Sequence, residues 1–174
     1  MSHWEPVLTD LVRQRGGALV RYAALLCGDR AEGEDLVQEA LTKVFAVMRK
    51  PPRGDGRVAI EHAEAYVRRT VLTLYLDGYR RRRRWAAVRH LLPGSESTAG
   101  PERHSPDRLD VDRALAVLGP RQRACMVLRY YADLTVPQIA DELGVSPGTV
   151  KRHLHDAGLH LVAELDGSLE GERR

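Results

Sequence analysis

The side chains best suited to contact a nucleic acid lie near the C-terminus, and they are Thr149, Lys151, Arg152 and His155. Arginine and lysine donate hydrogen bonds to base edges, threonine contacts bases or phosphates, and histidine offers a ring nitrogen. In a helix that begins at Pro147 these residues fall outside the apolar stripe, so they face solvent. An ordinary solvated helix face is the alternative interpretation.

A second group combines positive charge with aromatic rings. Arg80 to Arg84 form an unbroken run of five arginines between Tyr79 and Trp85. The guanidinium groups can neutralise phosphates, and the rings can stack on unpaired bases. A charged helix end beside a linker is the alternative, because the helix dipole favours cations at that end.

Residues for catalysis or metal binding are not evident. Asp35 and Glu39 are four residues apart on one predicted helix face, but two carboxylates without a histidine or a third acid are a weak metal signal, and a solvated polar face is the simpler interpretation. The sequence has no nucleophile elbow, phosphate-binding loop, His-Glu-x-x-His motif or Glu-x-x-His pair. We therefore expect no catalytic residue, no metal and no cofactor.

Two short helices joined by a sharp turn are predicted to position the C-terminal group. Thr135 can cap the first helix, and Gly144 ends it because the position after a helix often needs a positive φ. Ser146 and Pro147 are suited to start the second helix. The predicted inward residues are Ile139, Ala140 and Leu143 in the first helix and Val150, Leu154, Ala157 and Leu161 in the second. This layout suits a helix-turn-helix, whose second helix enters the major groove; a plain helical hairpin is the alternative.

The rest of the chain is predicted to be all-α, with two small helical domains, 1–92 and 108–174, joined by a flexible linker at 93–107 that is rich in Gly, Ser and Pro. The other predicted helices are Trp4 to Arg15, Ala18 to Leu26, Asp29 to Arg49, a helix from Glu61 into the arginine run, Leu109 to Leu118, and Arg121 to Tyr131. The apolar positions of two of these helices are Leu36, Val37, Ala40, Leu41, Val44, Phe45 and Met48, and Val67, Val71 and Leu74. The opposite face of the helix after Asp29 carries Asp35, Gln38, Glu39, Thr42 and Lys43.

Composition agrees with a basic helical protein. The 174 residues carry a formal charge of +3 and a pI of about 9.1, and aromatic residues make up only 5%. Cores built mainly from Leu, Val and Ala follow, as in small helical bundles. Cys27 and Cys125 are solitary, which favours buried free thiols in a reducing cytosol. No apolar run reaches membrane-spanning length and no export signal is evident, so we expect a cytoplasmic protein.

The motifs together resemble an extracytoplasmic-function sigma factor of bacterial RNA polymerase, in its actinobacterial branch, over nearly the whole chain. The motifs that carry the resemblance are Gly28-Asp29-Arg30 with Glu34 to Ala40, Ala65 to Thr70 leading to the arginines, Gly119 to Arg123 continuing through Leu128 to Tyr131, and Gly144 to Lys151. The resemblance implies that the first domain is sigma region 2, that the second is region 4, and that region 3 is reduced to a linker.

The resemblance also implies roles for particular residues. Asp35, Gln38 and Glu39 match the face that binds the clamp helices of the largest polymerase subunit, while region 4 meets the flap of the second largest. The segment from Tyr66 to Arg82 matches the part of the family that opens and holds the minus-10 element. Its implied contact residues are Tyr66, Arg69, Thr73, Tyr79, Arg80, Arg81 and Arg82. The family face that reads the minus-35 element is matched by Thr149, Lys151, Arg152 and His155. The residues implied to touch its phosphates are Arg121, Arg123 and Arg129. Promoter DNA, core polymerase and an anti-sigma factor are the implied partners.

Some positions depart from the family pattern. Thr73 stands where many relatives have Asn, and Gly78 stands where close relatives have an aromatic residue. Asp156 replaces a usual Arg, while His153 and Gly158 interrupt a stretch that is normally basic and helix-favouring. A glycine inside a helix costs about 1 kcal/mol relative to Ala, so we expect weak autonomous binding to the upstream element.

Two other classes of function compete with this interpretation. A polymerase-independent helix-turn-helix regulator would sense a ligand or dimerise through its N-terminal domain. It would not require the Asp35, Gln38 and Glu39 face or the arginine run. A small helical enzyme or metal-binding bundle with an accessory DNA domain would require a catalytic constellation, which is not evident.

Overall fold

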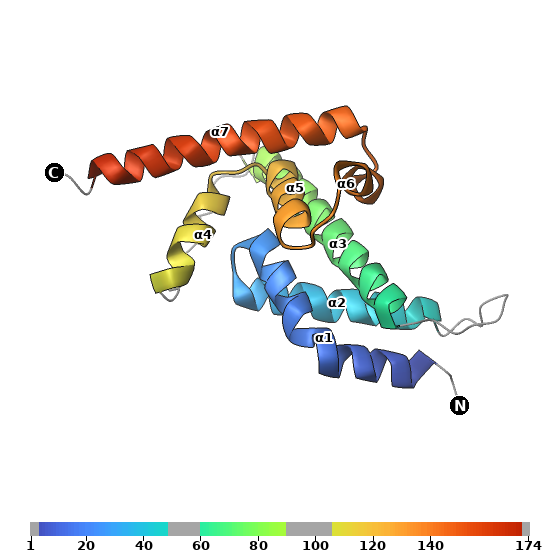
Figure 1. Cartoon of the computed structure of the whole chain (residues 1–174). Helices are drawn as coiled ribbons and strands as arrows, with labels where there is room; N and C mark the ends of the chain where they lie inside the picture. The colour runs from blue at the N-terminus through green and yellow to red at the C-terminus, as the bar shows by residue number, and fades with distance from the viewer. Residues whose placement is uncertain (1–3, 49–59, 90–105, 172–174) are drawn as a thin grey trace. The chain divides into compact units, whose positions relative to one another are not determined.

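The computed structural model describes residues 4–48, 60–89 and 106–171, and all the regular structure in these ranges is helical (Figure 1). The helices are α1 (Trp4–Cys27), α2 (Arg30–Met48), α3 (Ile60–Arg89), α4 (Pro106–Ala116), α5 (Pro120–Tyr130), α6 (Val136–Leu143) and α7 (Pro147–Gly171). They form two compact units, Met1–Tyr75 and Leu76–Arg174, and the division falls inside α3. The predicted all-α class is confirmed for the described residues.

In the first unit, a tight turn brings α2 back against α1. Gly28 ends α1 with φ 83°, a left-handed conformation that glycine adopts without a steric penalty. Asp29 then caps α2, because its Oδ1 accepts a hydrogen bond of 2.7 Å from the Glu32 backbone N–H. At Gly33 an added Cβ would lie 2.7 Å from the backbone nitrogen of Ala24, so the absence of a side chain permits the two helices to approach closely.

The core of the first unit comes from one face of each of its helices. Its buried side chains are Leu8, Leu11, Leu19, Tyr22, Ala23, Leu26, Val37, Ala40, Val44, Ala63, Val67, Val71, Leu72 and Tyr75. An ion pair of 3.5 Å between Arg15 Nε and Glu64 Oε2 joins α1 to α3 at the edge of this core. Val67 and Val71 were predicted to face inward and do so, whereas Leu74 is half-buried and Leu72 and Tyr75 complete the face.

The predicted break between residues 15 and 18 is wrong, because α1 continues through Gly16 and Gly17. Each glycine in a helix costs about 1 kcal/mol. The flanking Leu11 and Leu19 are 0% and 1% exposed, and burying a leucine side chain stabilises by about 1.5–3 kcal/mol. Burial on both sides of the glycine pair therefore outweighs its low helix propensity.

In the second unit, α5, α6 and α7 pack around a small apolar core, with α4 against α7 (Figure 1). Its buried apolar side chains are Leu115, Leu118, Ala124, Cys125, Val127, Leu128, Ile139, Ala140, Val150 and Ala157. The predicted inward residues Leu143, Leu154 and Leu161 are half-buried at the edge of this core. Cys125 is buried and Cys27 half-buried, and both are free thiols.

The apolar stripe predicted for α2 is only partly buried. Val37, Ala40 and Val44 are in the core, but Phe45 is 41% exposed, and Leu36 and Leu41 are half-buried. Residues 49–59, between the helices predicted at Asp29 to Arg49 and from Glu61, lie outside the described residues, as does most of the linker predicted at 93–107. Helix α4 begins at Pro106, inside the predicted linker. None of the described helices combines the length and the hydrophobicity that crossing a membrane requires.

Candidate nucleic-acid interface

The turn between α6 and α7 is built from backbone and side-chain hydrogen bonds at consecutive positions. Thr135 is the N-cap of α6, where its backbone N–H donates to Gln138 Oε1 at 2.8 Å. Gly144 ends α6 in the left-handed conformation, with φ 62° and ψ 41°, and Val145 N–H then donates to the Ala140 carbonyl oxygen at 3.0 Å. The cap and the left-handed glycine were both predicted. Gln138 was not, although a Gln three residues after a Thr cap is a capping-box signature.

Ser146 starts α7 as predicted. Its Oγ accepts a hydrogen bond of 3.2 Å from the Thr149 backbone N–H, and its carbonyl oxygen accepts from Thr149 and Val150. The hydroxyls of Ser146 and Thr149 are also 3.0 Å apart. These contacts fix the first turn of α7, which is the part of a recognition helix that reaches base edges.

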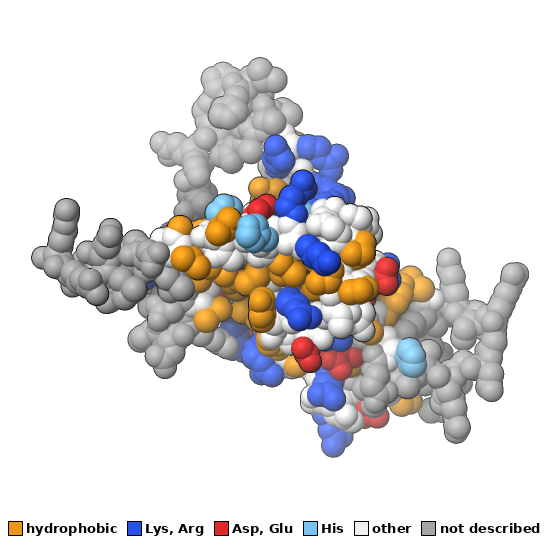
Figure 2. All heavy atoms as spheres, turned by 45° about the horizontal axis from the view of Figure 1, so that its top comes forward, with side chains coloured by type: hydrophobic (Ala, Val, Ile, Leu, Met, Phe, Trp, Pro, Cys, Tyr) orange, Lys and Arg blue, Asp and Glu red, His pale blue; other side chains and the backbone are white. Residues whose placement is uncertain are grey.

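The reading face of α7, defined as Thr149, Lys151, Arg152 and His155, points away from the core of its unit. Val150 and Ala157 are 0% exposed and anchor the opposite side, whereas Lys151, Arg152 and His155 are exposed and Thr149 is half-buried. In Figure 2, where the top of Figure 1 comes forward, basic side chains and histidines reach the surface among hydrophobic ones. The structure therefore brings the predicted upstream-element residues together on one exposed helix face.

The three arginines of α5 have different environments. Arg123 is only 7% exposed, which leaves little of its side chain accessible for the predicted phosphate contact. It lies one turn from Val127, which is also buried. Arg129 Nη1 donates to the Leu134 carbonyl oxygen at 2.9 Å, which fixes the segment that enters α6. Arg121 is half-buried.

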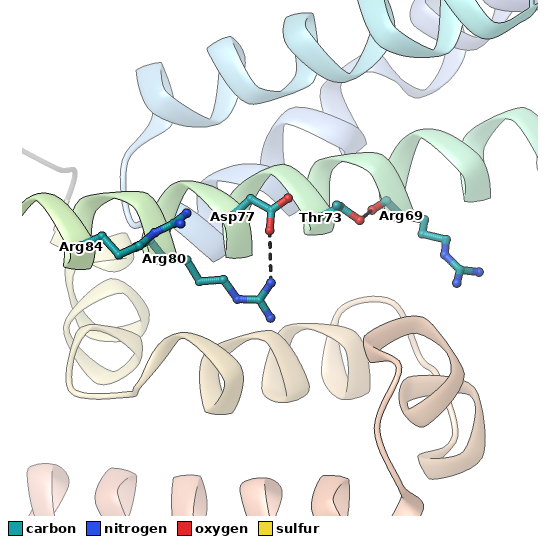
Figure 3. A network of polar contacts seen from close by, with 5 residues as sticks. All are labelled: Arg69, Thr73, Asp77, Arg80 and Arg84. Atoms are coloured by element: carbon teal, nitrogen blue, oxygen red, sulfur yellow. Dashed lines mark hydrogen bonds and ion pairs between the residues drawn. The ribbon is translucent and has the colours of Figure 1, made fainter.

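The predicted downstream-element residues all lie on α3, and their side chains are accessible. Tyr66 and Tyr79 are 44% and 39% exposed, and Trp85 is 62% exposed. The arginines from 80 to 84 are exposed as well, as are Arg69 and Thr73. Figure 3 shows Arg69, Thr73, Asp77, Arg80 and Arg84 following one another along the helix. We call these five residues the α3 stripe.

Helical geometry separates the downstream residues into different faces. At 3.6 residues per turn, the members of the α3 stripe fall within about 80° of one another around the helix axis, and Tyr66 falls among them. Arg82 is nine residues from Thr73 and therefore points about 180° away from it. Arg81 lies about 80° from Thr73, and Tyr79 about 120°. The predicted group is thus one accessible segment, but not a single face.

The polar face of α2, defined as Asp35, Gln38 and Glu39, is exposed as predicted. Glu39 forms an ion pair of 3.2 Å with Lys43, and both side chains are 55% exposed. Exposed pairs of this kind contribute about 0–1 kcal/mol, so Glu39 can exchange Lys43 for another partner at little cost. The buried Val37, Ala40 and Val44 hold the opposite side of the helix.

An apolar groove between α1 and α2 was not predicted. It has a volume of about 630 Å³ and is lined by Glu5, Leu8, Thr9, Val12, Arg13, Leu41, Thr42 and Phe45. Helical periodicity places Leu41 and Phe45 with the core residues of α2. Val12 and Phe45 are exposed because α1 and α2 no longer pack against each other there. The spacing of apolar residues in the sequence does not show where that packing ends.

Two groups in the second unit have shifted pKa values. Burial raises the pKa of the Cys125 thiol to about 11, although the charge of Arg121 acts in the opposite direction. The thiol is therefore protonated at neutral pH and is a poor nucleophile. Burial, followed by the charges of Arg152 and Arg121, lowers the pKa of His153 despite the opposing effect of Asp156. His153 sits beside the reading face and favours its neutral form.

Comparison with known proteins identifies the C-terminal helices. Residues 108–161 match the family model "Sigma-70, region 4". The chain is 33% identical to the RNA polymerase sigma-E factor of Streptomyces avermitilis over 181 aligned positions, which cover 100% of this chain and 97% of the relative. It is also 33% identical to the ECF RNA polymerase sigma factor SigL of Mycobacterium tuberculosis, with 87% and 84% of the two chains covered.

Solved structures share the fold. The sigma factor RpoE of Bartonella quintana, crystallised with the anti-sigma factor NepR, matches with a TM-score of 0.66 and 22% identity over 91% of this chain and 96% of that one. CnrH, in complex with the cytosolic domain of CnrY, matches with a TM-score of 0.59 and 21% identity over 91% and 87% of the two chains.

Proposed function

This chain belongs to the extracytoplasmic-function sigma factors, which are transcription initiation factors that direct bacterial RNA polymerase to promoters, and we propose that its promoter contacts are divided between α7 and α3. The observation that carries the proposal is the α6–α7 turn, whose caps leave Lys151, Arg152 and His155 exposed on one side of a buried core. On this proposal, the reading face of α7 contacts base edges of the minus-35 element. Within this face Thr149 is close to the phosphates, and Arg121 lies beside the face.

Helix α3 is proposed to contact the downstream, minus-10 element. Tyr66, Tyr79 and the arginines Arg69 and Arg80 to Arg82 are exposed along one helix. Their guanidinium groups neutralise the phosphates of the melted minus-10 strand, and the tyrosine rings stack on its bases. Stacking distinguishes a single strand from a duplex, and each stacked base is worth about 1–3 kcal/mol. Thr73 borders the place of one extruded base.

The polar face of α2 is proposed to bind the clamp helices of the largest polymerase subunit, and the second unit to meet the flap of the second largest. The functional domains are proposed as region 2 at residues 1–92, a linker at 93–107 and region 4 at 108–174, so that α3 belongs whole to region 2. We place the protein in the cytoplasm with the polymerase, as a non-enzymatic subunit. An anti-sigma factor is a further proposed partner, since similar folds occur in complexes with NepR and CnrY.

Formation of the open complex tests the proposed contact of α3 with the melted strand. Holoenzyme reconstituted with bacterial core polymerase is assembled on the upstream region of its own gene, and melting is followed by permanganate footprinting. The double variant Arg80→Ala/Arg81→Ala is expected to reduce opening strongly on duplex DNA, to regain much of it on pre-melted template, and to bind core normally. Arg13→Ala/Arg21→Ala is the matched control, because it removes the same number of charges from two exposed arginines of α1. Normal opening by the double variant would show that the arginines form only a solvated helix end.

Core binding tests the α2 assignment separately. Removing one charge from a desolvated interface pair costs about 2–5 kcal/mol, so Asp35→Ala and Glu39→Ala are each expected to weaken core binding while helicity is unchanged. Glu34→Ala is the control, because Glu34 is a half-buried acid on the same helix that pairs with Arg30 at 2.9 Å. Wild-type core affinity with both Asp35 and Glu39 replaced would overturn the assignment.

A further inference from the structure

Asp77 is the acidic residue of the α3 stripe, whose other charged residues are arginines. Between Ala65 and Arg89 it is the only acidic residue, while the same segment carries eight arginines. Its side chain is 61% exposed, and its Oδ1 lies 3.3 Å from Arg80 Nη1. A carboxylate at this point repels the phosphates that the surrounding arginines attract, so a bound strand must turn its backbone away from Asp77.

The ion pair with Arg80 does not explain Asp77. Both side chains are more than half exposed, and an exposed pair contributes about 0–1 kcal/mol. Arg80 can therefore leave Asp77 for a phosphate at little cost. In the free protein only one carboxylate oxygen is used in this pair, which leaves the other available as a hydrogen-bond acceptor.

Thr73 supplies a second acceptor one turn away. Its hydroxyl donates to the Arg69 carbonyl oxygen at 2.9 Å. Because a hydroxyl has one hydrogen to donate, its remaining capacity is to accept. Residues four apart on a helix have Cβ atoms about 5–6 Å from each other, so Thr73 and Asp77 present neighbouring acceptors, flanked by Arg69 and Arg80 (Figure 3).

We propose that Asp77, together with Thr73, selects an unpaired base that carries an exocyclic amino group, and so favours cytosine, adenine or guanine over thymine at one position of the melted strand. This inference rests on the proposed role of α3 in holding that strand. N4 of cytosine, N6 of adenine and N2 of guanine are exocyclic amino groups that donate hydrogen bonds, whereas thymine presents the acceptor O4 and has no amino group. An acceptor pair binds such an amino group and repels O4 of thymine, and the flanking arginines hold the phosphates on either side.

The experiment deletes single amino groups from the DNA. Holoenzyme is bound to pre-melted promoter templates in which each adenine of the non-template minus-10 strand is replaced in turn by purine, each cytosine by 2-pyrimidinone and each guanine by hypoxanthine. Dissociation constants are measured at one salt concentration. At one position the wild type is expected to lose about ten-fold in affinity, within the range known for a base contact. Asp77→Ala is expected to lose less than about two-fold on the same change, because the partner of the amino group is already gone.

Matched variants separate this contact from general charge effects. Glu34→Ala also removes an acid that is ion-paired with an arginine, and it is expected to keep the wild-type sensitivity to the amino group. Asp77→Asn adds an amide donor, so it is expected to improve binding of thymine at that position several-fold. Asp77 is exposed, and helicity and core binding of each variant report its folding.

The outcomes are distinguishable. Reduced opening of duplex DNA by Arg80→Ala/Arg81→Ala, together with a sensitivity to one amino group that disappears in Asp77→Ala, supports both proposals. A wild type that holds the melted strand but senses no amino group overturns the selection by Asp77, as does an Asp77→Ala variant that keeps the full penalty. Normal opening of duplex DNA by the arginine double variant instead overturns the role of α3.

Discussion

The two regions proposed to contact DNA position their side chains in different ways. In the α3 stripe, the contacts of Thr73, Asp77 and Arg84 join residues three or four apart within one uninterrupted helix. At the start of α7, the side chains depend on a left-handed glycine, a serine cap and a buried valine. A helix alone positions the first set, whereas a turn between two helices positions the second.

This difference predicts unequal tolerance to substitution. A side chain on α3 can be exchanged without moving its neighbours, because the backbone hydrogen bonds of the helix hold them. A residue of the α6–α7 turn sets the direction of α7, so its replacement displaces Lys151 and Arg152 together. Base readout needs this precision, while neutralisation of phosphates tolerates a longer reach.

Gly144→Val is expected to have the largest effect, because it places a β-branched residue at φ 62°. Such backbone strain costs about 1–3 kcal/mol. No atom lies within 4 Å of the added Cβ, so the loss comes from the backbone rather than from a clash. We expect lower resistance to urea, faster hydrogen exchange in α6 and α7, and lost selectivity for the minus-35 element.

Gly158→Ala is the matched control for Gly144→Val. Gly158 lies inside α7 and also has no atom within 4 Å of an added Cβ, but its φ is not positive. Alanine should stabilise the helix there by about 0.5–1 kcal/mol. If both substitutions changed stability in the same direction, the turn would not be the sensitive element that we describe.

Arg152→Ala and Arg81→Ala are expected to differ in the kind of DNA binding that they weaken. Loss of a base-reading arginine costs about 1–3 kcal/mol and relaxes selectivity at one base pair, whereas loss of a phosphate contact weakens all sequences alike and reduces the salt slope by about 1. Selection from a promoter library randomised at the minus-35 element, together with binding at several salt concentrations, measures both. Unchanged selection by Arg152→Ala would remove it from the readers.

Local chemistry explains which features could be predicted from the sequence. The α6–α7 turn was predictable because Thr135, Gly144 and Ser146 each satisfy a need of the backbone at their own position. The exposure of Lys151 and Arg152 followed from the period of the apolar residues in α7. These inferences require no knowledge of distant contacts, and the structure confirms them.

Features that depend on tertiary contacts were not predictable. Gly16 and Gly17 suggested a break, but burial of Leu11 and Leu19 carries α1 through them. The family resemblance placed Arg123 near the phosphates, yet it belongs to the buried face of α5. Its spacing from Val127 was the one signal of burial. The sequence shows only that Asp77 and Arg80 are three residues apart, whereas the structure shows that their side chains form an ion pair.

Ser146→Ala and Thr73→Ala compare the stability lost when each of two exposed hydroxyls with different structural roles is removed. Ser146 Oγ accepts from the Thr149 N–H, and loss of such a cap costs about 1 kcal/mol. Thr73 donates to a carbonyl within a helix, where alanine has the higher propensity, so its replacement should change stability by less than about 0.5 kcal/mol. Urea unfolding of the two variants measures the contrast. Equal losses would mean that α3 depends on side-chain contacts as much as the turn does.

The smallest expected effect is a pH dependence confined to the second unit. Burial and the charges of Arg152 and Arg121 lower the pKa of His153 from its ordinary value of 6.5. Its protonation therefore opposes folding: the stabilisation is complete above pH 6.5 and is lost as the pH falls through the lower folded-state pKa. His153→Gln should flatten the decrease in Tm between pH 7.5 and 5, and added salt should reduce the part that comes from the two arginines. His160→Gln, at an exposed position of the same helix, controls for an ordinary surface histidine. If the two variants had the same pH profile, the environment of His153 next to the reading face would not oppose its charge.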